Sequence, residues 1–323
     1  EGNGEDPYLG AAMARAYVRG YQGSNLQESD SSIMACLKHF ALYGASESGR
    51  DYNRTDISRV QMFNEYLPPY KAAVEAGVGT VMTSFNTIDG IPATADKWLI
   101  EDVLRKQWGM VVTDYNSIAE MNTHGVAPLK EAGILAMNAG TDMDMVSGSF
   151  LNTMEEAIEE GKVSEERIDE ACRRVLEMKY DLGLFSNPYK YCDTLRAQKV
   201  TYSAENRAEA RRIAAETFVL MKNNNVLPLQ MKGRIALIGP MADAANNMCG
   251  MWSMTCDPTK HSSLLDRLRA AAGDRAEILY AKGSNVYYDE KMEAGAVGIR
   301  PLQRGDDRKL LAEALSVASR ADV

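Results

Sequence analysis

Short apolar runs alternate along the first half of the chain with longer segments whose apolar residues recur at helical spacing. The apolar runs are MACLKHF (34–40), TVMTSF (80–85), MVVTD (110–114) and TDMDM (141–145). A strand that is apolar along its whole length is buried on both faces, as in a parallel sheet covered by helices. The pattern therefore predicts an α/β fold in which parallel strands alternate with helices.

The segments around these strands predict the helices. Helices are expected at 7–23, 57–77, 96–109 and 128–140, with two more at about 150–161 and 164–181. The second helix should be broken or kinked at Pro68-Pro69, because proline has no N–H to donate and its ring clashes with the preceding turn. Such strand–helix units correspond to about half of a (β/α)₈ barrel. An open doubly wound sheet is the alternative, because it has the same local pattern.

A turn-rich stretch separates this region from a second α/β pattern. We expect one domain at residues 1–185, a linker at 186–207, and the truncated beginning of an α/β sandwich domain at 208–323. In the last domain, helices are expected at 208–223 and 263–273, and strands at 234–239 and 276–283. Residues 310–323 should form a helix that leads into a strand.

The amino-acid composition indicates which kinds of molecule the protein can bind. The chain has 323 residues and a formal net charge of -9 at pH 7, and this acidic balance argues against nucleic acid and anionic membranes as partners. No run of about eighteen apolar residues predicts insertion into a membrane. The first residues lack the pattern of a signal peptide and the chain does not start with Met, so we expect an excerpt of a longer protein. A neutral small molecule is the partner that fits best.

The cysteines give little indication of a metal site. Cys249 and Cys256 are the closest pair, and their spacing matches no zinc pattern. The total of 5 cysteines, with Cys36, Cys172 and Cys192, is odd and does not close a disulfide framework. We expect all of them to be buried or free thiols. With 3 histidines in the chain, a metal site built from histidines is not expected.

Reactive side chains follow the ends of the predicted strands. Lys38 and His39 close the first strand, Met82 lies in the second, and Asp114 with Tyr115 ends the third. The carboxyl ends of barrel strands surround one mouth, where barrel enzymes place their sites. We therefore expect an acid, an amine and an imidazole to converge there from distant parts of the sequence.

Each of these residues also has a plainer interpretation. Lys38 and His39 are equally consistent with solvated groups at a strand end. Asp114 fits the N-cap of a following helix, because Asp is favoured at that position. Met82 fits a core residue. The expected convergence, rather than any one residue, favours a catalytic site.

Eight segments then add a more specific indication. They are GEDPYL (4–9), CLKHFALYG (36–44), YLPPYKAAVEAGVGTVMTSFN (66–86), LRKQWG (104–109), VVTDY (111–115), AGTDMDM (139–145), KYDLGLF (179–185) and KNNNVLPL (222–229). Together, and in this order, they resemble glycoside hydrolase family 3, more narrowly its two-domain bacterial β-glucosidases of the periplasmic type. The resemblance covers nearly the whole chain and implies that residues 1–185 are the C-terminal part of a catalytic TIM-like (β/α)₈ barrel.

The resemblance also implies an activity and a set of site residues. The activity is that of a retaining, exo-acting β-glycosidase that releases terminal β-D-glucosyl residues. In this family the residue matching Asp114 is the catalytic nucleophile. The residues matching Lys38, His39 and Met82 bind sugar hydroxyls, and the one matching Tyr115 shapes the first sugar subsite. A β-xylosidase of the same family is the alternative.

The expected partners follow from the same resemblance. They are a small oligosaccharide or β-glucoside, without a metal or organic cofactor, nucleic acid or membrane insertion, and the location is periplasmic or secreted. The acid/base Glu of the two-domain branch is expected beyond Val323. We therefore assign that role to no residue here, and interpret Glu120 as helical surface and Asp142 and Asp144 as turn acids.

Physical chemistry is consistent with these roles. Retaining hydrolysis uses two carboxyl groups about 5 to 5.5 Å apart, one attacking the anomeric carbon and one protonating the leaving oxygen. The attacking carboxylate must stay ionised, and the positive charge of Lys38 should lower the pKa of Asp114. One departure from the family pattern is that Trp108-Gly109 runs directly into MVVTD, where relatives have a few more residues.

Two hypotheses from other classes remain open on the sequence. One is a Schiff-base lyase that uses Lys38 at a barrel strand end as its amine. The other is a noncatalytic carbohydrate-binding relative, which would bind sugar without turnover.

Overall fold

A computed structural model describes residues 3–106, 110–250, 253, 256–291 and 303–323. The chain divides into two compact units, Glu1–Ser203 and Ala204–Val323, each of which has its own fold. The Trp108-Gly109 junction and the end of the predicted 96–109 helix lie outside the described residues.

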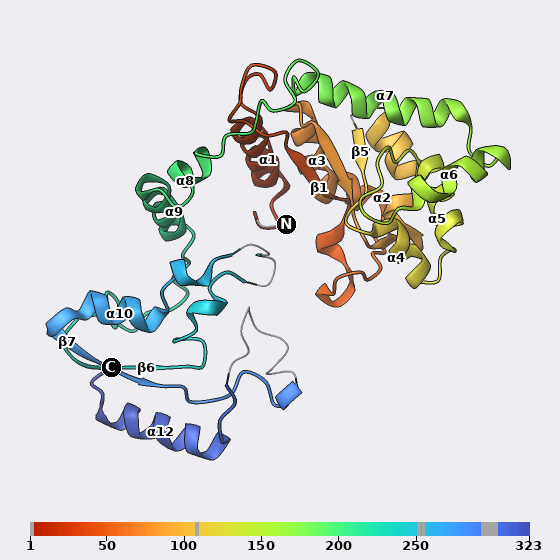
Figure 1. Ribbon diagram of the computed structural model, residues 1–323. Coiled ribbons are helices and arrows are strands. Elements are labelled where there is room, and N and C mark those ends of the chain that lie inside the picture. Colours follow the sequence, from red (N-terminus) through yellow and green to blue (C-terminus); the bar gives the residue numbers. More distant parts are fainter. Residues whose placement is uncertain (1–2, 107–109, 251–252, 254–255, 292–302) are drawn as a thin grey trace. The chain divides into compact units, whose positions relative to one another are not determined.

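The first unit is built on a parallel sheet, as predicted. The strands β1 (Cys36–Phe40), β2 (Thr80–Thr83) and β5 (Met110–Val112) pair in the order β1-β2-β5. All three run in the same direction, so their carboxyl ends meet at one edge (Figure 1). A short antiparallel hairpin, β3 (Thr87–Ile88) and β4 (Ile91–Pro92), follows β2.

The prediction of a fourth strand at 141–145 was wrong. This segment lies beside β5, but it makes only an isolated bridge between Val112 and Met143. Backbone bonds of 2.9 and 3.0 Å join Asp142 N–H to the Val111 carbonyl and Thr113 N–H to the Met143 carbonyl, and side chains replace the next ladder bonds on either side. The Val111 N–H donates to the Asp142 carboxylate at 3.0 Å, and the Met145 N–H donates to the Thr113 hydroxyl at 2.8 Å.

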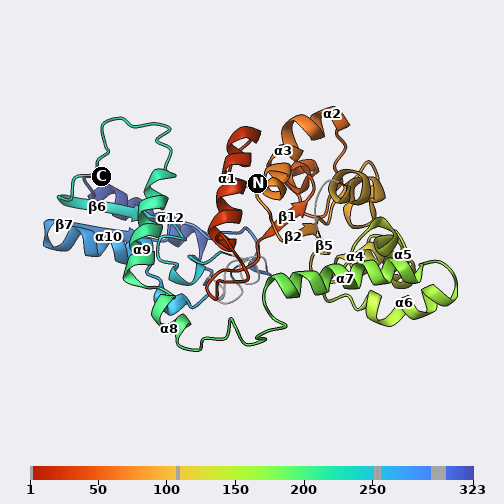
Figure 2. The same cartoon turned by 90° about the horizontal axis from the view of Figure 1, so that it is seen from above.

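The helices of the first unit largely follow the predicted periodicity. Their bounds are α1 (Pro7–Gln22), α2 (Arg59–Gln61), η3 (Met62–Tyr66), α3 (Leu67–Glu75), η5 (Trp98–Arg105), α4 (Ser117–Thr123), α5 (Leu129–Ala139), α6 (Ser149–Glu159), α7 (Glu165–Asp181) and α8 (Arg196–Val200). Single turns of 3₁₀ helix occupy η1 (Tyr43–Ala45), η2 (Glu47–Gly49) and η4 (Ala93–Ala95). Helices α4 to α7 gather on the β5 side of the sheet (Figures 1 and 2).

The irregularity expected at Pro68-Pro69 lies just before the prolines, and the backbone stays helical through them. The segment starts as α2, widens into the π-helical turn η3 and resumes as α3, with the prolines in the first turn of α3. Proline is tolerated there because its missing N–H would have no partner inside the helix.

The core lies between the sheet and these helices. Phe40, Val81 and Val111 of the three strands pack with Leu99 and Leu104 of η5. Burial of such side chains stabilises the fold by about 1.5–3 kcal/mol each. This packing covers one face of the sheet and holds the three strands so that their carboxyl ends lie at the same edge.

The second unit is a smaller parallel α/β layer. Strands β6 (Gly233–Ile238) and β7 (Ala276–Ala281) pair in parallel, and α10 (Leu264–Ala272) and α12 (Asp307–Arg320) lie on opposite sides of them (Figure 1). Asp322 and Val323 continue along β6 through backbone hydrogen bonds of 2.8 and 2.7 Å to Arg234 and Ala236. Short 3₁₀ turns are η6 (Ala245–Asn247), η7 (Pro258–Lys260) and η8 (Gly273–Arg275).

Two predictions for this unit need correction. The helix expected at 208–223 is α9 (Ala204–Glu216), which ends in a turn where the N–H and the hydroxyl of Thr217 both donate to the Ala214 carbonyl, at 3.2 and 2.8 Å. Cys249 and Cys256, expected to be free or buried thiols, form a disulfide. Their spacing gave no signal, because it is the fold of the β6–α10 loop that brings the two sulfurs together. The other three cysteines are free, as predicted.

Candidate active site

The carboxyl edge of the first sheet brings two of the predicted site residues into contact. His39 comes from the end of β1, and Asp114 comes two residues after the end of β5. The Nε2 atom of His39 lies 3.1 Å from Oδ2 of Asp114. The expected convergence of an imidazole and an acid from separate strands is therefore present in the fold.

Asp114 is held in place and its carboxylate is largely buried, with 7% of the residue exposed. Its Oδ1 accepts the N–H of Tyr115 at 2.7 Å. Its Oδ2 is buried and has Nε2 of His39 as its neighbour at 3.1 Å, within hydrogen-bonding distance but without good alignment. One carboxylate oxygen is thus fixed, while the other faces the site without a bound N–H.

The surroundings favour the ionised form of Asp114. Burial raises the pKa of this carboxyl, but the contact with His39, the Tyr115 N–H and the charge of Lys38 together lower it below its ordinary value. The net direction is that required of a group that must stay negatively charged at neutral pH.

Backbone hydrogen bonds fix the turn that carries Asp114. The N–H of Asn116 donates to the Met145 carbonyl at 2.9 Å, and the N–H of Met145 donates to the Thr113 hydroxyl at 2.8 Å. Asn116 has φ 60, a left-handed conformation that Asn tolerates better than most residues. The segment 141–145, although it is not a strand, therefore still anchors the turn that carries Asp114.

A buried chain of hydroxyl groups lies beneath this turn. Thr94 Oγ1 is 2.9 Å from Thr83 Oγ1 and 2.7 Å from Ser117 Oγ, and the Thr141 hydroxyl donates to the Thr94 carbonyl at 3.3 Å. These bonds join β2, η4 and the start of α4. The sequence analysis missed them, because isolated Thr and Ser residues carry no pattern that reveals a tertiary partner.

An arc of aromatic rings extends from His39 to the helix after Asp114. Ring centroids are 5.3 Å apart for His39 and Tyr43, 6.0 Å for Tyr43 and Phe85, 4.8 Å for Phe85 and Tyr52, and 6.1 Å for Tyr52 and His124. Except for His39, these residues were also missed. Such rings offer flat apolar faces with polar edges beside the carboxylate.

Glu120 is not simply helical surface, as had been expected. It lies on α4 and is half-buried, and its Oε2 is buried without a hydrogen-bond partner among the described residues. Burial raises the pKa of Glu120, and the negative charge of Asp114 adds to this rise while His124 opposes it. A second carboxyl with the opposite pKa shift thus lies within electrostatic range of Asp114.

The other three predicted site residues, Tyr115, Met82 and Lys38, differ in the exposure and direction of their side chains. Tyr115 follows Asp114 directly and is 63% exposed. Met82 is partly buried in β2, opposite Val112 of β5. Lys38 acts on Asp114 through its charge, but its side chain lines a different cavity.

That cavity is a groove of about 1120 Å³ between α1, β1 and α3. Neither His39 nor Asp114 lines it, so this groove does not coincide with the acid–imidazole contact. We place the candidate site at the contact, because chemistry needs reactive groups and the groove wall is mainly apolar.

Asp142 and Asp144 have structural roles. Asp142 is buried and forms ion pairs with Arg105 (2.8 Å), Arg167 (3.2 Å) and Arg174 (2.9 Å). Asp144 accepts from the N–H of Phe150 at 3.2 Å, in the first turn of α6. Asp144 thus begins a turn, as expected, whereas Asp142 is not a turn acid but the buried centre of an ion-pair cluster.

Comparison with known proteins identifies the family. Residues 1–178 match the glycosyl hydrolase family 3 N terminal domain, and residues 218–323 match the glycosyl hydrolase family 3 C-terminal domain. Among curated proteins, the chain is 40% identical over 337 aligned positions to a periplasmic beta-glucosidase of Salmonella typhimurium, covering 100% of this chain and 44% of the relative. It is 34% identical to a beta-xylosidase of Formosa agariphila, covering 88% of this chain and 42% of that protein.

Solved structures of beta-glucosidases have the same fold as this chain. The beta-glucosidase of Listeria innocua in complex with isofagomine superposes with a TM-score of 0.82 at 34% identity, covering 99% of this chain and 42% of that one. A beta-glucosidase involved in saponin metabolism from intestinal bacteria gives a TM-score of 0.85 at 32% identity, covering 99% and 45%. The chain thus spans less than half the length of these relatives. The predicted α/β class, part of a TIM-like barrel followed by an α/β unit, is confirmed, and the chain belongs to glycosyl hydrolase family 3.

Proposed function

We propose that the protein is a retaining, exo-acting β-glycosidase, a β-glucosidase that releases terminal β-D-glucosyl residues, with Asp114 as its nucleophile. The observation that carries this proposal is the buried carboxylate of Asp114. Its Oδ1 is fixed by an N–H and its Oδ2 faces His39. The pKa of this carboxyl is lowered, and the chain belongs to a family of glycosyl hydrolases.

In the proposed mechanism, Oδ2 of Asp114 attacks the anomeric carbon and forms a covalent glycosyl-enzyme, which water then hydrolyses. A second carboxyl group protonates the leaving oxygen and later activates the water. We propose that this acid/base is a Glu beyond Val323, as the family resemblance implies. The contact of Nε2 with Oδ2 keeps the His39 ring at the position where a sugar would meet the carboxylate.

The other predicted residues receive roles in binding. We propose that Lys38 and His39 donate hydrogen bonds to sugar hydroxyls, and that Met82 also contacts the sugar. Tyr115 is proposed to shape the first subsite, and its large exposed fraction supports this, because an exposed ring next to the nucleophile is available to a ligand. Binding groups that strengthen in the transition state would speed the reaction rather than only tighten binding.

The substrate proposed is a small oligosaccharide or β-glucoside. The curated and structural relatives named as beta-glucosidases support glucose at the nonreducing end. A β-xylosidase is the second candidate, because beta-xylosidases are also among the relatives above 30% identity. The Schiff-base lyase is not favoured, since the chain belongs to a hydrolase family.

Domain roles and location are part of the same proposal. Residues 1–185 would be the C-terminal part of the catalytic barrel, 186–207 a linker, and 208–323 the beginning of the second domain. The name of the Salmonella relative supports a periplasmic location. No helix among the described residues is both long and apolar enough to cross a membrane.

A mechanism-based label tests the assignment. The full-length protein would be treated with an activated 2-deoxy-2-fluoro-β-glucoside, which forms the glycosyl-enzyme but hydrolyses slowly, and its peptides analysed by mass spectrometry. We expect the sugar on the peptide that contains Asp114. A label on another carboxylate would refute the role of Asp114, and a faster reaction with the corresponding xyloside would favour the β-xylosidase.

A further inference from the structure

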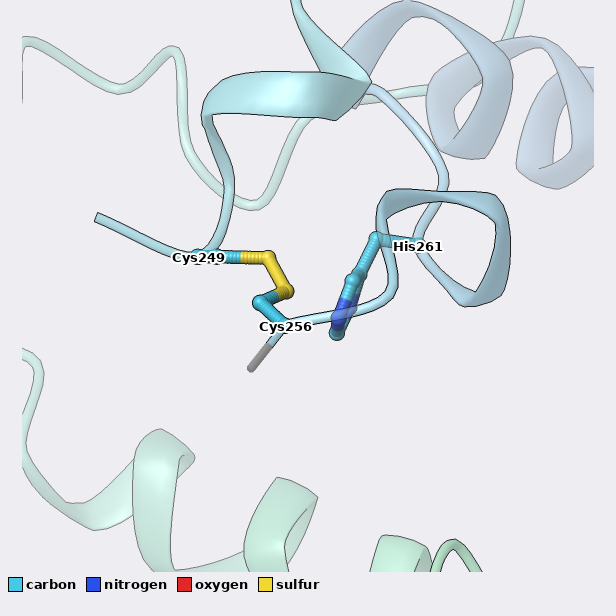
Figure 3. A group of neighbouring side chains, drawn as sticks. All are labelled: Cys249, Cys256 and His261. Atoms are coloured by element: carbon cyan, nitrogen blue, oxygen red, sulfur yellow. A yellow bond between two sulfur atoms is a disulfide. The ribbon is translucent and has the colours of Figure 1, made fainter. Parts of the chain in front are cut away.

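Three potential metal ligands gather in the loop between β6 and α10. The sulfurs of Cys249 and Cys256 and a ring nitrogen of His261 all lie within 4.8 Å of one another. Figure 3 shows the imidazole beside the disulfide, with all three side chains pointing into the same space. Each is partly exposed, so solvent species can reach the group.

Local hydrogen bonds fold the loop into this arrangement. The Ser253 hydroxyl donates to the Cys249 carbonyl at 2.5 Å, and the N–H of Cys256 donates to the Ser253 carbonyl at 3.4 Å. These bonds bring the Cα atoms of the two cysteines to 6.1 Å. The turn η7, closed by a hydrogen bond of 3.1 Å from Lys260 N–H to the Asp257 carbonyl, then brings His261 back beside them.

The donor set has a clear chemical preference. Two thiolates and an imidazole are soft and borderline ligands of the kind that Zn²⁺ selects. With Zn–S distances of about 2.3 Å and Zn–N distances of about 2.0–2.1 Å, the donors around one ion lie within about 4 Å of each other. The observed grouping needs only small side-chain movements to reach that geometry, once the sulfurs are no longer bonded to each other.

We propose that Cys249, Cys256 and His261 form a redox-controlled site for Zn²⁺, which binds the metal as a dithiol and excludes it as a disulfide. In the disulfide form the two sulfurs are joined and cannot act as thiolates. Two equivalents of a small-molecule thiol supply the two electrons and two protons that convert the disulfide to two thiols, and are themselves joined in a disulfide. Zinc binding then releases the two thiol protons.

Water fills the fourth position of such a site. Asp257 is nearby in sequence, but its Oδ1 already accepts from the Thr259 N–H at 3.0 Å and from the Thr259 hydroxyl at 2.6 Å. Three protein ligands with an open position resemble reactive or regulatory zinc sites more than closed structural ones. In an oxidising compartment such as the proposed periplasm the disulfide form prevails, and the dithiol form requires a supply of thiol.

Zinc titration of the full-length protein tests the proposal without using its activity. The protein would be reduced, stripped of metal, and titrated with Zn²⁺ against a coloured chelator, in parallel with an oxidised sample. We expect one more Zn²⁺ per chain in the reduced sample than in the oxidised one. Cys256→Ser and His261→Asn should weaken that binding at least tenfold, while Cys192→Ser, which removes an exposed free thiol elsewhere, should leave it unchanged.

Cobalt provides a readout of ligand identity. Reduced protein with Co²⁺ should show an absorption band from thiolate-to-metal charge transfer, and the band should be weaker in Cys249→Ser, which keeps only one of the two thiolates. Equal zinc binding by the reduced and oxidised samples would overturn the proposal. So would unchanged zinc affinity in both Cys256→Ser and His261→Asn, because both donors would then lie outside the site.

Discussion

At the scale of single residues, the candidate site depends on two acids whose environments act in opposite directions. Asp114 has a hydrogen-bond donor and two basic groups around it, which lower its pKa. Glu120 has a buried oxygen without a partner and the negative charge of Asp114 nearby, and its pKa is raised. Neighbouring acids with separated pKa values are a common sign of a functional site, although structural networks also produce them.

The first prediction concerns the nucleophile. Asp114→Asn in the full-length protein should lower kcat by about a thousandfold or more, because the amide cannot form the glycosyl-enzyme. The fold should persist, since the substitution keeps the shape of the side chain. Hydrolysis of an aryl β-glucoside and the circular dichroism spectrum are the measurements.

Asp89→Asn is a matched control, because Asp89 is exposed in the turn between β3 and β4, and Asn tolerates its positive φ of 51. This variant should keep full activity. Near-normal turnover by Asp114→Asn would show that another group attacks the sugar.

The second prediction concerns the pH dependence of stability. Because the folded pKa of Glu120 is raised above its unfolded value, the folded state holds the proton more tightly, and stability falls as pH rises through this window. Glu120→Gln mimics the protonated form. Its Tm relative to the unaltered protein should therefore increase between pH 4 and pH 7, whatever constant offset the amide introduces.

Glu155→Gln, an exposed substitution on α6, should show no such pH-dependent difference. A constant difference in Tm between Glu120→Gln and the unaltered protein over this pH range would contradict the raised pKa.

For Asp114→Asn, the Tm relative to the unaltered protein should change in the opposite direction with pH, and at lower pH. The stability supplied by the ionised carboxylate is present above its unfolded pKa and lost as pH falls through the lowered folded value.

The sequence revealed the residues whose position follows from strand direction, but not those that depend on tertiary contacts. His39 and Asp114 were expected at one mouth because parallel strands end at one edge. Tyr52, Phe85 and His124 come from loops and a helix whose meeting no local pattern specifies. Glu120 looked like helical surface because periodicity does not show which loop covers a helix.

At the scale of secondary-structure elements, the charged cluster around Asp142 links the sheet to the outer helices. Its carboxylate, with 0% of the side chain exposed, contacts Arg105 from η5 and Arg167 and Arg174 from α7. Its Oδ2 also accepts the N–H of Val111 in β5, at 3.0 Å. Burial lowers the pKa of Arg167, while the charge of Asp142 opposes this effect.

The third prediction tests this cluster. Asp142→Asn should destabilise the fold by about 3–5 kcal/mol, because it removes the buried carboxylate shared by the largely buried Arg105 and Arg167 and leaves them only their more exposed partners Glu101 and Glu170. Urea unfolding followed by fluorescence is the measurement. Asp169→Asn on α7, where the acid is exposed, should change stability by less than about 0.5 kcal/mol. Equal stability of the two variants would mean that the buried pairs contribute nothing.

Element prediction from the sequence succeeded where periodicity was strong and failed where side chains competed with the backbone. Helices α1, α5 and α7 agree with the apolar spacing because each packs one face on the unit's interior. The strand expected at 141–145 does not form, because the side chains of Asp142 and Thr113 replace backbone partners on either side of the single bridge. The disulfide was not predicted, because the fold of the loop, and not the cysteine spacing, brings the two sulfurs together.

At the scale of the whole molecule, the first sheet has an open side. β1 lies at the end of the β1-β2-β5 order, and a groove of about 1120 Å³ runs beside it between α1 and α3. Exposed strand edges and apolar grooves promote association unless other parts of a protein cover them. The chain spans 44% of its Salmonella relative, which leaves ample length for such a cover.

The fourth prediction follows from this open side. A polypeptide of residues 1–323 alone should not hydrolyse cellobiose at a useful rate, because the proton donor is proposed to lie beyond Val323 and, within the described part of the chain, β1 pairs with no strand on its outer side. The same residues within a chain as long as the relatives should be active. Efficient cellobiose hydrolysis by residues 1–323 would refute both the missing donor and the need for a completed barrel.

The central claim is that Asp114 attacks the sugar, and azide rescue of Asp114→Gly tests it most directly. In this variant azide can enter the space of the lost carboxylate and displace an activated aryl leaving group in a single inverting step. Nuclear magnetic resonance of the product from an aryl β-glucoside should identify the α-glucosyl azide. A β-glucosyl azide would contradict the account, because it requires a double displacement through an intact nucleophile elsewhere.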